Sequence, residues 1–253
     1  MYEKRFDGRK FNELRPIEAE VGVIKRANGS AMFKIGDTIA YAAVYGPRDL
    51  YPKFLQNPKK GILRCNYSMM PFSGSGDRVR PGPNRRAREI SLVTEKALLP
   101  VINLEDYPNS VVDVFIEFPQ TDAGSRCAGI CAASLALADA GISMKNLVSS
   151  VAVGKVDDKI VVDLNYNEEA YDHVEGGDPN AHVSDIPIAI VPNTGEITLL
   201  QMDGQMEEED LYEAIKVAKE ATKEILKIQT KVLKEKFQNN GDNNEWKYKK
   251  TCY

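Results

Sequence analysis

Residues 18–46 contain β-rich apolar runs that are interrupted at "ANGS" and at "IGDT". Because glycine, asparagine, serine and aspartate favour turns, this pattern predicts a meander of three consecutive strands. Further β-rich runs predict strands at 63–69, 111–118, 148–154, 160–164, 186–191 and 196–202. The last four of these form two hairpins, one across "VDDK" and the other across "PNTG".

Three other segments carry the composition of helices, at 84–103, 125–140 and 207–238. The middle segment has apolar or small residues on nearly every face, which is typical of a helix packed closely on other elements, and Gly141 ends it. The last segment begins with acidic residues and becomes lysine-rich, in agreement with the helix dipole. Strands grouped before and between helices predict an α+β fold, a mixed α/β arrangement of β-sheets packed with helices. We expect one domain at 1–238 and a disordered tail at 239–253.

The helix predicted at 125–140 starts with Ser125 and Arg126, directly after Gly124. A cation in the first turn opposes the helix dipole by roughly 0.3–1 kcal/mol, whereas the unpaired N–H groups of that turn form a site for an anion. One interpretation is that Arg126 and the helix start bind an anion together, with Gly124 letting the backbone approach it. The alternative is that Ser125 only caps the helix and that Arg126 pairs with Asp122.

The helix predicted to begin near Asn84 has the same feature. Asn84 is a good N-cap residue, and Arg85 and Arg86 follow it in the first turn. Two helix starts with cations favour a common anionic ligand. For this basic segment taken alone, a solvated surface in which Glu89 pairs with Arg85 is the alternative.

The composition limits what the anion can be. The chain has 253 residues, of which 43% are hydrophobic and 28% charged, as is typical of a globular protein. No apolar run reaches the roughly 20 residues of a membrane span, and the N-terminal residues lack a secretory signal, so a cytoplasmic location is expected.

A net charge of −4 argues against binding nucleic acid through overall charge. A polyanion must therefore be bound locally, at the basic segments 46–61 and 76–88.

Several common catalytic groups are scarce or missing. Histidine occurs only as His173 and His182, which leaves little for a nucleophile that depends on histidine, although a histidine metal site stays open. The chain contains neither GxxxxGK[ST] nor GxGxxG, the common nucleotide-binding patterns. Its four cysteines show no CxxC spacing and are expected to be buried thiols.

Carboxylates remain as candidates for the chemistry. Four of them lie near the ends of predicted strands: Asp163, Glu168, Glu169 and Asp185. At such positions carboxylate oxygens can hold Mg²⁺ or serve in general acid catalysis. For each of them, an exposed loop charge is the alternative interpretation.

Several stretches spread over residues 5–235 resemble the catalytic RNase PH-type subunits of the archaeal exosome: "FDGRKFNELRPIEAEVGV", "YAAVYGPR", "NRRAREIS", "TDAGSRCAG" with "AASLALADAGI", "VDLNY" and "SDIPIAIVP". The resemblance implies an RNase PH-like fold and a phosphorolytic 3′→5′ exoribonuclease. In that reaction inorganic phosphate attacks the terminal phosphodiester of RNA and releases a nucleoside diphosphate.

The resemblance also implies partners. These are an inactive RNase PH-type paralogue, with which three copies of the chain alternate in a hexameric ring, and RNA-binding cap proteins. Three alternatives stay open: a non-catalytic scaffold subunit of the same ring, a homohexameric RNase PH that trims tRNA, and an enzyme acting on a small-molecule phosphate.

Individual residues match the family's functional positions. The phosphate site corresponds to Gly124, Ser125, Arg126 and Arg86, and the RNA-binding residues correspond to Arg85, Arg86 and Arg48. Asp185 matches the second acidic residue of the family, which has general-acid or metal duty. These roles agree with phosphoryl transfer, which depends mainly on positioning and charge neutralisation.

The first acidic residue departs from the family pattern. It is usually an aspartate, whereas "NYNEE" aligns Glu169 with it. Glu169 and Asp185 are therefore the expected catalytic pair and the expected Mg²⁺ ligands. The inserted residues 173–182 separate them, so Asp172 or Asp178 can take the place of Glu169. A loss of activity is the other possible consequence, although the retained "GSR" and "RR" argue against it.

Overall fold

A computed structural model of the chain describes residues 2–75, 78–80, 82, 84–173, 177 and 182–242, with only the backbone for 239–242. In chain order the described helices and strands are β1 (Ile17–Val21), β2 (Gly29–Ile35), β3 (Thr38–Asp49), η1 (Lys53–Leu55), β4 (Ile62–Met69), α1 (Arg85–Leu98), η2 (Leu99–Val101), η3 (Leu104–Asp106), β5 (Ser110–Gln120), α2 (Ser125–Asp139), β6 (Ser149–Val156), β7 (Lys159–Val162), α3 (Tyr166–Glu169), β8 (Val183–Val191), β9 (Glu196–Leu200) and α4 (Glu208–Asp242).

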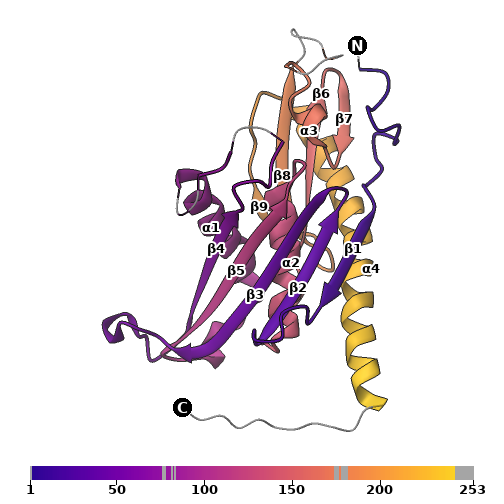
Figure 1. The fold of residues 1–253 in the computed structure, drawn as a ribbon. Helices are drawn as coiled ribbons and strands as arrows, with labels where there is room; N and C mark the ends of the chain where they lie inside the picture. Colours follow the sequence, from indigo (N-terminus) through magenta and orange to yellow (C-terminus); the bar gives the residue numbers. More distant parts are fainter. Residues whose placement is uncertain are drawn as a thin grey trace.

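The strands form two sheets (Figure 1). In the first, β1, β2 and β3 are the predicted antiparallel meander, and the full order is β1-β2-β3-β5-β4. Strand β4 runs parallel to β5, because the chain returns through α1 between them. The second sheet has the order β7-β6-β8-β9 and is antiparallel throughout. Both predicted hairpins, β6 with β7 and β8 with β9, are confirmed.

Helix α2 packs against both sheets, which explains why its sequence is apolar on nearly every face. It contacts β2, β3 and β5 of the first sheet and β6 and β8 of the second. Twelve of its fifteen residues are buried, and a Cβ on Gly129 would already meet the Phe118 ring at 3.1 Å. The helix ends at Asp139, and Gly141 follows with a φ of 73°. The predicted closely packed helix is therefore confirmed, and its N-terminus lies near the core.

The two other long helices cover the remaining parts of the sheets. Helix α1 packs on β4 and β9, and α4 runs along one side of both sheets against β1, β6 and β7 (Figure 1). The side chain of Asn84 accepts a hydrogen bond from the N–H of Ala87 at 2.7 Å, so the predicted cap of α1 is confirmed. Helix α4 continues to Asp242, so residues 239–242 are helical rather than part of a disordered tail. Residues 243–253 lie outside the described residues.

No helix within the described ranges is both long and apolar enough to cross a membrane.

Gly154 of β6 lies directly opposite Asp185 of β8, and the strands leave it no room for a side chain. A Cβ there would meet the carbonyl oxygen of Ser184 at 2.1 Å and Cδ1 of Leu164 at 2.7 Å. We therefore expect Gly154→Ala to lower the free energy of unfolding by about 1–3 kcal/mol, as measured by urea denaturation. Gly74→Ala is the control, because its Cβ would meet its nearest neighbour at 3.6 Å. Equal losses in both variants would contradict the prediction.

Candidate functional site

The start of α2 is an uncapped helix terminus. Ala123 and Gly124 before it both adopt left-handed backbone conformations, with φ values of 53° and 61°. Gly124 is the N-cap residue, and no side chain caps the first N–H groups of the helix. Ser125 is the first residue of α2, so the alternative that it caps the helix is wrong. The first N–H groups of α2 are therefore available to a ligand.

The Ser125 side chain is fixed by the first sheet. Its Oγ lies 2.8 Å from the hydroxyl oxygen of Tyr67 on β4, in a buried hydrogen bond. Burial raises the pKa of Tyr67, so the phenol keeps its proton at neutral pH. The pair therefore holds one hydroxyl group beside the uncapped helix start.

Arg126 has a hydrogen-bond donor without a partner. Its Nη1 donates to Oε1 of Gln201 at 2.7 Å, and its Nη2 lies 3.6 Å from Oε1 of Glu89. Its Nε is buried and has no hydrogen-bond partner among the described residues. The predicted alternative, a pair with Asp122, is wrong, because Asp122 binds Arg15 instead. A buried N–H without a partner is costly, so an anion near Arg126 would satisfy it.

Arg86, in the first turn of α1, supplies the second cation. Both Arg85 and Arg86 are exposed, but Arg86 lines both of the cavities at the site and Arg85 lines neither. Glu89 does not pair with Arg85, because it lies near Arg126 and accepts from Nε2 of Gln201 at 3.1 Å. The two helix starts that carry cations thus meet at one cavity, as the prediction of a common anionic ligand requires.

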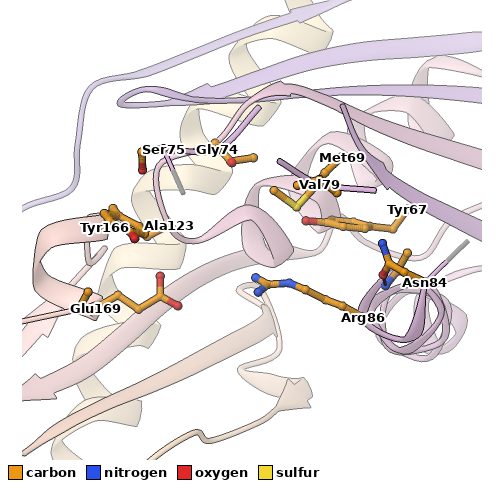
Figure 2. A pocket seen from close by; sticks show the side chains of 13 residues that line it. Tyr67, Met69, Gly74, Ser75, Val79, Asn84, Arg86, Ala123, Tyr166 and Glu169 are labelled. Carbon is orange, nitrogen blue, oxygen red and sulfur yellow. Dashed lines mark hydrogen bonds between the residues drawn. The ribbon is translucent and has the colours of Figure 1, made fainter. Parts of the chain in front are cut away.

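Two cavities of about 400 and 420 Å³ adjoin at the site. Both are lined by Arg86, Ala123 and Glu169. Figure 2 shows the Arg86 guanidinium and the Glu169 carboxylate pointing toward each other across the first cavity. The first cavity also has the more apolar walls, with Tyr67, Met69, Val79 and Tyr166. The second also contains Gly124, Ser125, Arg126, Asp185, Gln201 and Asp203.

Four carboxylates line the second cavity: Glu89, Glu169, Asp185 and Asp203. Two of them, Glu169 and Asp185, are the predicted catalytic residues, and they come from different elements. Glu169 ends the short helix α3, and Asp185 lies in β8. Burial, followed by the nearby Glu169, raises the pKa of Asp185 to about 7. Desolvation also raises the pKa of Glu169 against the effect of Arg86 and Arg126, although its side chain stays open to the cavity. Oδ1 of Asp185 is buried and lacks a hydrogen-bond partner within the described part of the chain. This atom is therefore available to a ligand.

The other two predicted carboxylates stabilise the fold. Asp163 is 2% exposed and accepts hydrogen bonds from Arg15 at 2.7 and 2.9 Å. Glu168 is fully buried, and its two oxygens accept from Nε and Nη2 of Arg5 at 2.7 Å each. Because both carboxylates are already paired, the prediction that they serve the chemistry is wrong for these two.

The alternatives to Glu169 are not placed in the cavities. Asp172 lines neither of them, and its Oδ2 lies 3.3 Å from Nε2 of the exposed His173. Asp178 lies outside the described residues. Of the two described candidates for the first acidic residue, Glu169 and Asp172, Glu169 lines the second cavity together with Asp185, and Asp172 does not.

The segment after β9 supplies two functional candidates that the sequence analysis missed. Gln201 bridges Arg126 and Glu89. Asp203 lines the second cavity, and its backbone exchanges hydrogen bonds with that of Asp185 at 2.9 and 2.8 Å. Polar residues in "QMDG", at the end of the strand predicted at 196–202, were the available indication, since loops at strand ends commonly carry functional side chains.

Arg48 lies near the end of β3 and lines neither cavity. Its Nη2 is 2.5 Å from Oδ2 of Asp113, and Nε of Arg64 is 2.7 Å from Oδ1 of the same carboxylate. Burial acts to raise the pKa of Asp113, but hydrogen bonds from Arg64 and Arg48 lower it overall. Two half-exposed guanidiniums on one carboxylate leave an excess of positive charge here.

The described residues contain no group of three or more histidines, cysteines or carboxylates arranged to hold a metal ion. His173 and His182 are exposed and line neither cavity. As predicted, three cysteines are buried free thiols, and burial raises the pKa of each: Cys65, Cys127 and Cys131. Cys252 lies outside the described residues.

The fold, with two sheets around α2 and a site at its N-terminus, can be compared with known protein families. Models of domains 1 and 2 of the 3′ exoribonuclease family, RNase PH, match residues 13–143 and 146–221. The chain therefore belongs to this family, and the predicted RNase PH-like α+β fold is confirmed.

Named relatives and a solved structure agree with this membership. Exosome complex component Rrp41 of Pyrococcus abyssi is 50% identical over 234 residues, covering 92% of this chain and 90% of that protein. Its counterpart from Methanopyrus kandleri is 48% identical over 233 residues, covering 92% and 93%. The crystal structure of rice Rrp46 has a TM-score of 0.75 with 27% identity, covering 89% of this chain and 98% of that one.

Proposed function

We propose that this chain is a phosphorolytic 3′→5′ exoribonuclease and the catalytic subunit of an archaeal exosome ring. The observation that carries the proposal is that Arg86, Arg126 and the uncapped start of α2 surround one cavity with Asp185 and Glu169. Cations and free amides suit phosphate, and carboxylates beside them suit proton transfer or Mg²⁺. The similarity to archaeal Rrp41 proteins supports the assignment.

Inorganic phosphate binds at the start of α2 in this proposal. The N–H groups after Gly124, the Ser125 hydroxyl and the guanidiniums of Arg126 and Arg86 neutralise its charge. One phosphate oxygen attacks the phosphorus of the last phosphodiester of RNA. The bond to the 3′-oxygen of the preceding nucleotide breaks, and the terminal nucleotide leaves as a diphosphate. Positioning and charge neutralisation suffice for this step, so it needs no nucleophilic side chain.

The leaving 3′-oxygen needs a proton, which Asp185 can supply. With a pKa of about 7, this carboxyl group is partly protonated at neutral pH, as a general acid should be. Glu169 contributes by its charge, because it is among the causes that raise the pKa of Asp185. Glu169 and Asp185 are therefore the proposed catalytic acids.

As an alternative to proton donation by Asp185, the same two carboxylates in their ionised forms fit Mg²⁺. This ion is commonly held by one or two carboxylates together with phosphate oxygens of the substrate, and Oδ1 of Asp185 has no partner within the described ranges. Asp203 adds negative charge on the same cavity wall. When bound, Mg²⁺ would neutralise charge on the reacting phosphates.

RNA and protein partners complete the proposal. We propose that Arg85, which lies beside Arg86, and Arg48, which shares the carboxylate of Asp113 with Arg64, contact the RNA backbone outside the cavities. Because the relatives are exosome components, we propose a hexameric ring in which three copies of this chain alternate with an inactive paralogue and carry RNA-binding caps. We place the ring in the cytoplasm, where RNA and inorganic phosphate are both present, and we propose that the chain up to the end of α4 at Asp242 forms a single domain.

An RNA-decay assay on the protein co-purified with its ring partner tests the proposed function. We expect nucleoside diphosphates, and only with phosphate present, because phosphate is the attacking group. Replacing phosphate by sulfate, an anion of similar shape, is the matched control and should give no product. Nucleoside monophosphates released by water would contradict phosphorolysis. RNA binding without any product would favour the scaffold subunit, and a homohexamer of this chain alone in light scattering would favour a tRNA-trimming enzyme.

A further inference from the structure

We propose that Asp122, Arg15 and Asp163 form a clamp that holds Glu169 in place relative to the phosphate loop, residues 123–126. Asp122 and Arg15 are then positioning residues for the reaction. This inference rests on the proposed function, because the clamp would fix the distance between the phosphate-binding residues and the acidic residues of that site.

Asp122 joins the phosphate loop directly to the helix that carries Glu169. Its Oδ1 accepts the backbone N–H of Tyr166, the first residue of α3, at 3.0 Å. Its Oδ2 accepts a hydrogen bond from Nη1 of Arg15 at 3.1 Å, and its carbonyl oxygen accepts one from the same nitrogen at 2.5 Å. Asp122 thus links the phosphate loop to α3, and the reaction requires a fixed distance between these two elements.

Arg15 joins the phosphate loop to the chain segment just before α3. Its Nε and Nη2 donate to the two oxygens of Asp163 at 2.9 and 2.7 Å, and its backbone N–H donates to Oδ2 at 2.8 Å. Arg15 and Asp163 are only 6% and 2% exposed. A buried charge pair of this kind keeps its geometry, since separating the charges leaves each one uncompensated.

The two connected parts are themselves anchored. The Thr38 hydroxyl accepts the N–H of Asp122 at 2.8 Å and lies within hydrogen-bond distance of the carbonyls of Asp122 and Ala123. On the other side, Arg5 binds Glu168, the neighbour of Glu169. Helix α3 has only four residues, too few to be stable alone. Its position, and with it that of Glu169, therefore depends on these contacts.

Asp122→Asn tests the clamp with little change in shape. Both carboxylate oxygens of Asp122 accept hydrogen bonds, so whichever way the amide turns, its nitrogen faces a donor, Nη1 of Arg15 or the N–H of Tyr166, and one of the two links opens. We expect kcat to fall by about 10- to 100-fold, because small displacements of reacting groups cost this much. RNA affinity should stay within about twofold, since Arg85 and Arg48 are untouched. Arg15→Lys should give a similar loss, because one ammonium group cannot bridge both aspartates as a guanidinium does.

Asp139→Asn is the matched control, at the opposite end of α2. Like Asp122, Asp139 accepts a backbone N–H, from Ser30 at 3.0 Å, and pairs with a cation, Lys236, although its side chain is 2% exposed against 29% for Asp122. It should lower the urea midpoint about as much as Asp122→Asn but leave kcat unchanged. Equal kcat in both variants would show that Asp122 is merely structural and would overturn the clamp.

Crystal structures of the two variants give a readout that does not depend on turnover. We expect the Glu169 carboxylate to move relative to Ser125 in Asp122→Asn and to stay in Asp139→Asn; an unmoved Glu169 in both overturns the clamp. Absence of nucleoside diphosphate from the wild-type ring would reject the proposed function instead, so the two failures are distinguishable.

Discussion

Replacing Arg126 or Arg86 by alanine is expected to abolish phosphorolysis, with turnover falling by about 10²–10³-fold for each. Both guanidiniums line the cavity at the start of α2, where they neutralise the charge of the attacking phosphate. Folding should be nearly unaffected, because a cation in the first turn of a helix opposes its dipole. The Arg86 side chain is exposed, so its removal leaves the core unchanged, and removal of the Arg126 side chain breaks mainly its hydrogen bond to Gln201. Turnover and the urea midpoint, measured on the assembled ring, check both parts.

Lys96→Ala is the control for the arginine variants. Lys96 lies in the last turn of α1, is exposed and lines neither cavity, so its loss should leave turnover unchanged. The KM for phosphate should rise in the arginine variants far more than the RNA concentration for half-maximal rate. Near-normal turnover in either arginine variant would show that the phosphate site is assigned wrongly.

Asp185→Asn should nearly eliminate turnover, by about 10²–10⁴-fold, while RNA still binds. The change keeps the size of the side chain but removes its proton chemistry and its capacity to hold Mg²⁺. Glu169→Gln should be similarly harmful, because Glu169 shares the cavity with Asp185. Asp172→Asn is the comparison, since Asp172 lies outside both cavities. A harmful Asp172→Asn combined with an active Glu169→Gln would move the catalytic role to the other acid. Single-turnover decay and RNA binding, measured side by side, separate chemistry from affinity.

Asp185 should also make the stability of the metal-free and phosphate-free protein depend on pH. Its pKa is about 7 in the folded chain against an ordinary value of 3.8. Between these values the folded state keeps a proton that the unfolded state releases, so the free energy of unfolding decreases as pH rises through this interval. Urea denaturation at pH 5 and pH 7.5 should show the decrease in the wild type and a smaller one in Asp185→Asn. Parallel pH dependences would contradict a raised pKa.

The sequence alone determined most of the secondary structure, since turns and helix ends depend on residues a few positions apart. "ANGS" and "IGDT" separate the strands of the meander, and Gly141 follows the end of α2, as predicted. The sequence also indicated an anion site, because Arg86 and Arg126 conflict with the dipole of their own helices. Neither inference needed contacts between distant parts of the chain.

Only the tertiary structure decided which acids belong to the site. Glu168 and Glu169 are adjacent and chemically alike, yet Arg5, 163 positions from Glu168, pairs with Glu168 and leaves Glu169 to the cavity. Asp122, a predicted partner of Arg126, binds Arg15 instead, at a separation of 107 positions. Hydrogen bonding, burial and Coulomb interactions act through space. The packing of both sheets around α2 sets those distances, and spacing along the chain does not reveal them.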